Sequence, residues 1–145
     1  MGRLISEKEE VDAFKNELKN LRFYEKKIRE FKEKKEVLEY EMQNVKGIDY
    51  SKQSGTYNES SVNFKRLAMI DEMEWIEKQI EYWEAKVVPI RKVLNRMNKE
   101  DRKLVTDVVT RKRTYKSVCI EKKIVPSTLF NMIHYIIAEA QKKGE

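Results

Sequence analysis

Residues 69–97, MIDEMEWIEKQIEYWEAKVVPIRKVLNRM, carry the most regular hydrophobic pattern in the chain. The large apolar residues follow alternating steps of four and three, a period that is typical of a coiled-coil seam. They are Met69, Met73, Ile76, Ile80, Trp83, Val87, Ile90, Leu94 and Met97. The pattern predicts a long helix over about 61–97, with a kink or a break near Val88 because Pro89 lies within it.

A similar pattern precedes this segment. Ser6 and Glu9 have the spacing of a capping box, which predicts that a helix begins at Ser6. Apolar residues then recur in steps of three and four, with interruptions at Glu25 and Lys35. The seam consists of Val11, Phe14, Leu18, Leu21, Ile28, Phe31, Leu38, Met42 and Val45. We therefore expect a second long helix that ends at Lys46 and packs antiparallel against the first.

Between the two patterns, residues 47–61 hold two glycines and four serines and have no apolar face. This composition predicts a flexible loop. A phosphate-binding loop is not favoured, because no Gly-Lys-Ser/Thr follows Gly55. Residues 1–97 are thus predicted to form a helical hairpin or coiled coil. Its central aromatic residues could form a binding surface, but core or oligomer contacts are favoured. These aromatic residues are Trp75, Tyr82 and Trp83.

Composition agrees with an all-α fold. Of the 145 residues, 39% are charged and 40% hydrophobic, with four glycines and two prolines. A single cysteine and a single histidine exclude a zinc site of several such ligands and a disulfide framework. No apolar run has the length of a membrane helix, and the start resembles no signal peptide. We expect a cytoplasmic protein that is not an enzyme and has no catalytic residue, metal or cofactor.

Residues 98–145 break into shorter helical segments. Asn98 and Asp101 are placed to cap a helix with an inward face of Leu104, Val105, Val108 and Val109, which ends in the basic run 111–113. Thr114 caps a short helix over 115–121, with Val118 and Cys119 inward. Pro126 stops this helix and suits the first turn of a last helix, which Ser127 and Thr128 open and which runs to about Lys142. Its inward residues are Leu129, Ile133, Ile136 and Ala140, while Phe130 and Ile137 indicate an additional contact. Two short helices, a turn and a longer helix predict a helix-turn-helix domain over 98–145.

Charge favours DNA as the partner of this domain. Residues 1–50 hold 12 basic and 12 acidic side chains, whereas residues 99–145 hold 11 and 6. In a helix-turn-helix protein the polar face of the last helix reads base edges, and nearby cations bind phosphates. The predicted reading residues are Ser127, Thr128, Asn131, His134 and Tyr135. The predicted supporting residues are Arg111, Arg113, Thr114, Lys116, Lys122 and Lys123.

Three segments of this domain resemble the promoter-reading domain of sigma factors. They are Glu100-Asp-Arg-Lys-Leu-Val, Arg113-Thr-Tyr-Lys-Ser-Val-Cys and Val125-Pro-Ser-Thr-Leu-Phe. The order of a long charged hairpin, a Ser/Gly-rich loop and this domain resembles the phage late-gene transcription activators of the RinA/ArpU/LtrC type. The chain departs from the pattern at Lys122 and Lys123, which replace the usual Leu-Gly of the turn, and at Val125, where a polar cap is common.

The resemblance implies a sequence-specific transcriptional regulator that binds promoter DNA in a bacterial host, with RNA polymerase as a further partner and the hairpin as an oligomer contact. Two alternatives stay open. A small terminase-like packaging protein also joins a helix-turn-helix to an oligomerising coiled coil. A coiled-coil adaptor would bind protein through its C-terminal bundle and no DNA.

Overall fold

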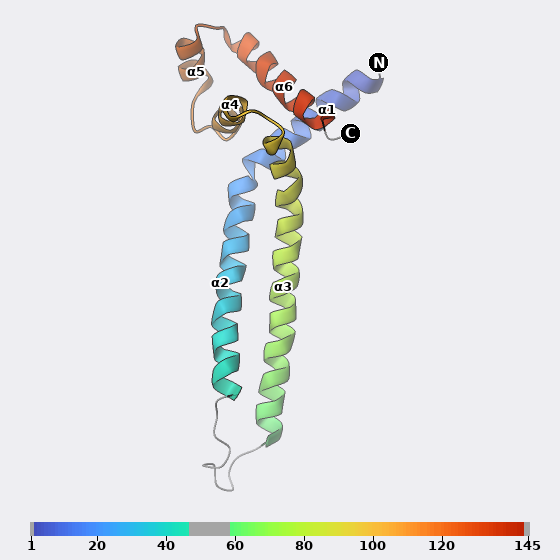
Figure 1. The fold of residues 1–145 in the computed structure, drawn as a ribbon, viewed down its shortest axis with the longest axis vertical. Coiled ribbons are helices and arrows are strands. Elements are labelled where there is room, and N and C mark those ends of the chain that lie inside the picture. The colour runs from blue at the N-terminus through green and yellow to red at the C-terminus, as the bar shows by residue number, and fades with distance from the viewer. Residues whose placement is uncertain (1, 47–58, 144–145) are drawn as a thin grey trace. The chain divides into compact units, whose positions relative to one another are not determined.

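The computed structural model describes residues 2–46 and 59–143, and the side chains of residues 7–44 and 63–143. Every regular element in these ranges is a helix, so the predicted all-α class is confirmed (Figure 1). The predicted loop at 47–61 lies outside the described residues except for 59–61, which are helical. No described helix has the length and apolar character needed to cross a membrane. The helices are α1 (Gly2–Lys19), α2 (Leu21–Lys46), α3 (Glu59–Asn95), α4 (Lys99–Val109), α5 (Tyr115–Lys122) and α6 (Pro126–Lys142).

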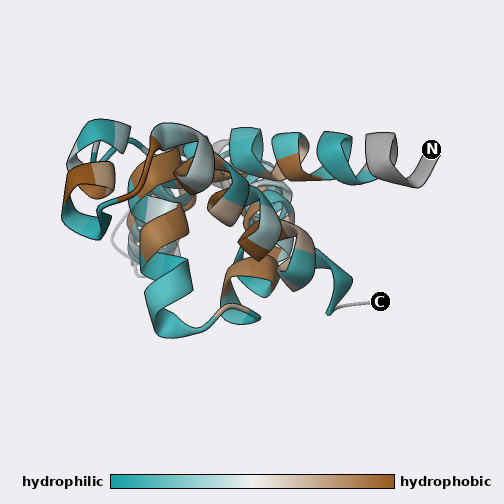
Figure 2. Ribbon diagram, turned by 90° about the horizontal axis from the view of Figure 1, so that it is seen from above, coloured by the Kyte–Doolittle hydropathy of each residue, from teal (hydrophilic) through white to brown (hydrophobic). Residues whose placement is uncertain are grey.

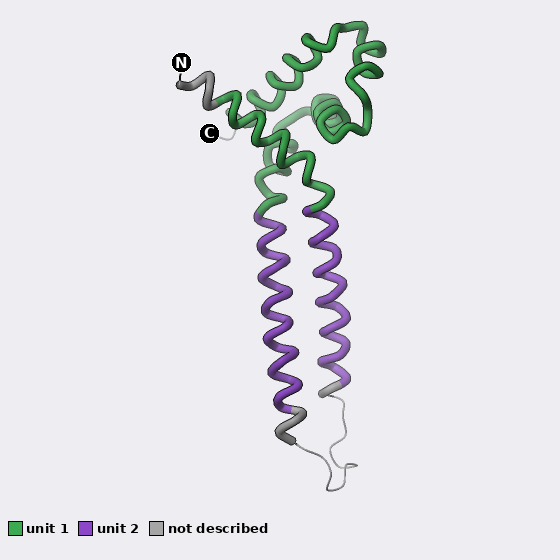
Figure 3. Tube along the Cα trace, turned by 180° about the vertical axis from the view of Figure 1, so that it is seen from behind, with its two compact units in different colours: residues 1–23, 86–145 green, residues 24–85 purple. Residues whose placement is uncertain are grey.

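The chain divides into two compact units (Figure 3). Unit 1 comprises residues 1–23 and 86–145, and unit 2 comprises residues 24–85. These units do not follow the predicted division after residue 97. The reason is that α1 and the last turns of α3 bury their apolar side chains in the same unit as α4, α5 and α6.

In unit 2, α2 and α3 lie side by side and run in opposite directions (Figure 1). Lys32 Nζ lies 3.5 Å from Glu84 Oε1, and further along α2, Lys35 Nζ lies 3.5 Å from Glu77 Oε1. Lys35 thus occupies its seam position with a half-buried stem and a paired ammonium group. The seam is filled by a cluster of apolar side chains, with Met42, Met73, Ile80 and Trp83 packed around Phe31, Leu38, Met69 and Ile76.

Unit 1 is built around α6, which contacts α1, α4 and α5. Figure 2 shows hydrophobic residues toward the middle of the helices of this unit and hydrophilic residues along its outline. Most of the predicted inward residues of α4, α5 and α6 are buried, while Leu104 and Ile136 are half-buried. The core consists of Val11, Phe14, Leu18, Val87, Ile90, Leu94, Met97, Val105, Val108, Val109, Val118, Cys119, Leu129, Ile133, Ile137, Ala138 and Ala140.

The predicted first helix differs from the structure at its start and in its middle. It begins at Gly2, so Ser6 lies inside α1 and does not start the helix; residues 3–6 contain no residue that breaks a helix. It is also interrupted at Asn20, and this interruption separates α1 from α2. The N–H of Asn20 donates to Glu17 O at 3.0 Å. The apolar steps continue from Leu18 to Leu21 across this interruption, so the hydrophobic period gave no sign of it.

Near Val88, where a kink or a break is expected, the structure has no break. Helix α3 continues through Pro89 to Asn95. Proline removes one backbone hydrogen bond, which costs about 3 kcal/mol in a helix interior. Burial of Val87 and Ile90, on either side of the exposed Pro89, opposes this cost and holds both halves in one helix.

We expect Leu18→Ala to lower the free energy of unfolding of unit 1 by about 2–5 kcal/mol, because Leu18 is fully buried in the core of that unit. Urea unfolding followed by far-ultraviolet circular dichroism measures the change. Asn16→Ala, at an exposed position of the same helix, is the matched control and should change stability little. Equal effects of the two substitutions would contradict the packing of α1 into unit 1.

Candidate nucleic-acid interface

The connection from α4 to α5 places a basic side chain in an unusual backbone conformation. The side chain of Asn98 caps α4 by accepting the N–H of Asp101 at 2.8 Å, as predicted. After the last turn of α4, Arg111 adopts φ 60° and its N–H donates to Val108 O at 3.2 Å. This left-handed region costs a residue with a Cβ roughly 1–2 kcal/mol and usually holds glycine.

Helix α5 repeats this arrangement at its own end. Its N-cap is Thr114, as predicted, whose hydroxyl accepts the N–H of Ser117 at 3.1 Å. After Lys122, Lys123 adopts φ 57° and ψ 46°. The N–H of the next residue, Ile124, donates to Cys119 O at 3.0 Å, which is the bond of a Schellman motif. Lys123 therefore occupies a glycine position, where the sequence departs from the sigma-factor pattern.

Helix α6 begins at Pro126, one residue before the expected start at Ser127, without a side-chain cap at Val125. Pro126 lies in its first turn, as predicted. The Thr128 N–H donates to Val125 O at 3.0 Å, and the side chains of Ser127 and Thr128 are exposed. Asn131, one turn further, is also exposed. The first two turns of α6 therefore present hydroxyl and amide groups close in the chain to the end of α5.

The segment from 111 to 123 has a strong positive charge, with six basic side chains and one acidic side chain. Arg113 pairs with the carboxylate of Glu121, so this predicted phosphate contact is occupied within the chain. The other basic side chains of the segment are exposed, and none forms a hydrogen bond or an ion pair with the described residues. They are Arg111, Lys112, Lys116, Lys122 and Lys123.

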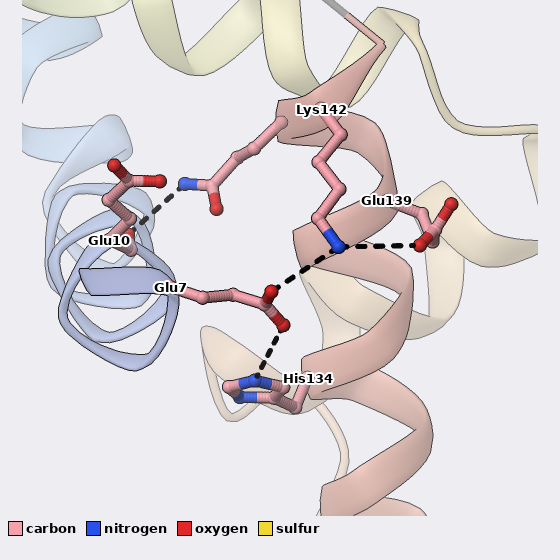
Figure 4. A network of polar contacts seen from close by, with 6 residues as sticks. Glu7, Glu10, His134, Glu139 and Lys142 are labelled. Carbon is pink, nitrogen blue, oxygen red and sulfur yellow. Dashed lines mark hydrogen bonds and ion pairs between the residues drawn. The ribbon is translucent and has the colours of Figure 1, made fainter. Parts of the chain in front are cut away.

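His134 lies on the same helical stripe as Ser127 and Asn131, but it stands further along α6 and is half-buried. Its Nε2 lies 3.8 Å from Glu7 Oε1 on α1, and Glu7 Oε2 lies 3.3 Å from Lys142 Nζ (Figure 4). The neighbouring helix α1 therefore makes His134 less accessible than Ser127 and Asn131, and its role in reading DNA stays a prediction. The sequence assigned α1 to the hairpin, so it gave no signal of this contact.

Tyr135 is 65% exposed but lies two turns from the start of α6. It lines a hollow of about 260 Å³ together with Asn98 and Asp101, where α3 connects to α4. Ser127, Thr128 and Asn131 thus lie on the turns of α6 that follow α5. Tyr135 lies instead at the hollow between α3 and α4.

The additional contact indicated by Phe130 is with α1. Lys15 Nζ lies 4.2 Å from the centroid of the Phe130 ring, a cation–π arrangement. Burial lowers the pKa of Lys15, opposed by Asp12. On α5, burial raises the pKa of Tyr115, with a smaller contribution from Cys119.

Comparison of the chain with models of known families, with curated proteins and with solved structures finds no match. Within residues 2–46 and 59–143, no three or more His, Cys, Asp or Glu side chains are grouped so that they could hold a metal ion.

We expect Lys123→Gly to raise the free energy of unfolding by about 0.5–1 kcal/mol. Glycine relieves the left-handed strain of roughly 1–2 kcal/mol, offset in part by its greater freedom in the unfolded chain. The adjacent Lys122→Gly is the matched control: it places glycine in the last turn of α5 and should destabilise. Thermal unfolding of both variants measures the difference, and a destabilised Lys123→Gly would contradict the backbone conformation.

Proposed function

We propose that this protein is a sequence-specific DNA-binding transcriptional regulator. In this proposal α4, α5 and α6 form a helix-turn-helix domain, and α2 and α3 are the arms of a helical hairpin. The start of α6 enters the major groove, and the basic side chains around α5 bind the flanking phosphates.

The observation that carries the proposal is the group of five exposed basic side chains without an acidic partner in the described chain, defined above as Arg111, Lys112, Lys116, Lys122 and Lys123. Two of them, Arg111 and Lys123, stand at positive φ, where glycine would be more stable. A charged side chain at such a position suggests a role outside folding. Phosphate binding is the role that fits cations beside a helix N-terminus.

The net charge of each of the two units supports the same proposal. Residues 1–23 and 86–145 hold 20 basic and 11 acidic side chains, a net charge of +9. Residues 24–85 hold 11 and 14, a net charge of −3. The excess positive charge of the chain is therefore confined to the unit that contains α5 and α6, as expected when one part of a protein binds a polyanion.

The resemblance to the RinA/ArpU/LtrC type adds a more specific proposal. The protein would activate late genes of a bacteriophage in the cytoplasm of the host, with RNA polymerase as a partner and self-association through the hairpin. The promoter-reading segments of this resemblance lie in α4, α5 and the start of α6.

The proposal is tested by selecting bound fragments from the genome that encodes the protein and measuring affinity by fluorescence anisotropy over a range of salt concentrations. We expect enrichment of promoter-sized sites and an affinity that falls steeply with salt. Each lost phosphate contact should reduce the slope of log K against log salt by about 0.9. Lys123→Ala should show this reduction and weaken all sequences alike.

Lys8→Ala is the matched control, because Lys8 is exposed on α1 of the same unit and distant in sequence from α5. It should leave both the slope and the affinity nearly unchanged. If the protein shows no salt-sensitive binding to DNA, the proposal is overturned in favour of the adaptor. A ring of many copies in light scattering would favour the packaging protein.

Asn131→Ala tests the reading of bases. An asparagine that makes a bidentate contact to adenine contributes about 1–3 kcal/mol of discrimination. The variant should therefore lose preference at one base pair while its affinity for unrelated DNA stays the same. His134→Ala is the comparison, and it should leave sequence preference unchanged because His134 faces Glu7. The proposed reading face is wrong if only His134→Ala alters the preferred sequence.

A further inference from the structure

Unit 2 has a hollow along its side, outside the seam that joins α2 and α3. It encloses about 540 Å³. The buried seam residues Leu38 and Ile76 form its floor, and Val37 and Trp75 stand beside them. Val37 is 58% exposed and Trp75 is 52% exposed. The hollow therefore offers an apolar surface that neither α2 nor α3 covers.

Trp75 is held in a defined position at this hollow. Its ring stands edge-on to Phe31, with centroids 5.6 Å apart and an interplanar angle of 75°. Since Phe31 belongs to the buried seam, this contact fixes the indole without burying it. A rigid, half-exposed tryptophan over an apolar floor is typical of the residues that dominate binding energy at protein interfaces.

The rim of the hollow is acidic. Four glutamates from both helices line it, with Lys34 as the one basic residue of the lining. Lys34 Nζ lies over the Phe31 ring, 5.1 Å from its centroid, and Glu30 pairs with Lys27 at 3.6 Å. The other three glutamates form no hydrogen bond or ion pair with the described residues. They are Glu33, Glu41 and Glu72.

We propose that this hollow is a docking site for a cationic amphipathic helix of another protein. The apolar face of such a helix would cover Val37 and Trp75. Its Lys or Arg side chains would meet the unpaired carboxylates of Glu33, Glu41 and Glu72. An amphipathic helix laid into a groove is a common mode of peptide recognition, and opposite charges set its orientation.

Charge argues against a symmetric dimer of the chain through this face. A symmetric dimer through this face would place the same surface of both copies in contact. The glutamates of the two rims would then oppose one another, and juxtaposed like charges oppose association. The proposal is independent of DNA binding, which is proposed for residues of unit 1.

The test uses the full chain carrying Trp83→Phe, which leaves Trp75 as the sole tryptophan. The probe is a synthetic helical peptide with Leu at i, i+3, i+4 and i+7 and Lys elsewhere. We expect saturable binding with a blue shift of the Trp75 emission. The same peptide with Glu in place of Lys should not bind, and failure of the Lys peptide to bind would overturn the proposal.

Two pairs of variants, measured by anisotropy of a labelled peptide, separate docking from general attraction. Trp75→Ala should weaken binding by at least about tenfold, as for a residue at the centre of an interface. Tyr40→Ala, at an exposed aromatic position of α2 outside the hollow, should not. Should Trp75→Ala fail to fold, Val37→Ser gives the same comparison at the other side of the hollow.

The second pair concerns charge. A triple change to Gln at the unpaired rim glutamates should weaken binding strongly, while the same change at exposed glutamates outside the hollow should have a small effect. The control positions are Glu36, Glu39 and Glu81. Equal weakening by both triples would mean unspecific attraction and would overturn the proposal. So would a self-association, seen in sedimentation, that Trp75→Ala abolishes.

Discussion

Burial of one helix, α6, is the constraint on which the arrangement of unit 1 depends. Leu129, Ile133 and Ile137 are fully buried, and their helix contacts α1, α4 and α5. Since burying such a side chain contributes about 1.5–3 kcal/mol, these three residues alone exceed the cost of the two left-handed turns. The strained connections at Arg111 and Lys123 are therefore sustained by the core and need no stabilisation of their own.

The same packing separates two surfaces of α6. The polar residues of the N-terminal turns stay exposed beside the cations of α5, whereas α1 covers one side of the C-terminal half, where Glu7 meets both His134 and Lys142. The carboxylate of Glu7 thus pairs with a cation near the C-terminal end of the helix, whereas the cations beside its N-terminal end keep their charge unpaired except for Arg113. Unlike the basic residues around α5, those near the C-terminus are used inside the unit: Arg96 donates to Ala140 O at 3.3 Å, and Lys143 donates to Arg96 O at 3.4 Å.

Much of the helix pattern could be predicted from the sequence, because a period of 3.5 residues shows which side of a helix is buried. The seam of α3 was found in this way, and the caps at Asn98 and Thr114 were found from side chains that accept a backbone N–H at the start of a helix. The period does not show what covers the buried side. Val11, Phe14 and Leu18 continue the steps of α2 yet pack into the core of unit 1, so the interruption at Asn20 was missed. The approach of His134 to Glu7 was missed for the same reason, since it joins residues far apart in the chain.

Contact with α1 limits the number of α6 side chains that one copy of the protein is able to present to DNA bases under the proposed function. Ser127, Thr128 and Asn131 are the exposed polar side chains of its first two turns, and among them only Asn131 has the two groups of a bidentate base contact. One such contact provides about 1–3 kcal/mol, whereas specific sites are preferred over other DNA by roughly 4–10 kcal/mol. The difference has to come from further contacts, from the shape of the DNA or from a second DNA-bound protein. Unit 2 carries no excess of positive charge, so its contribution to specificity would be made through protein partners rather than through DNA.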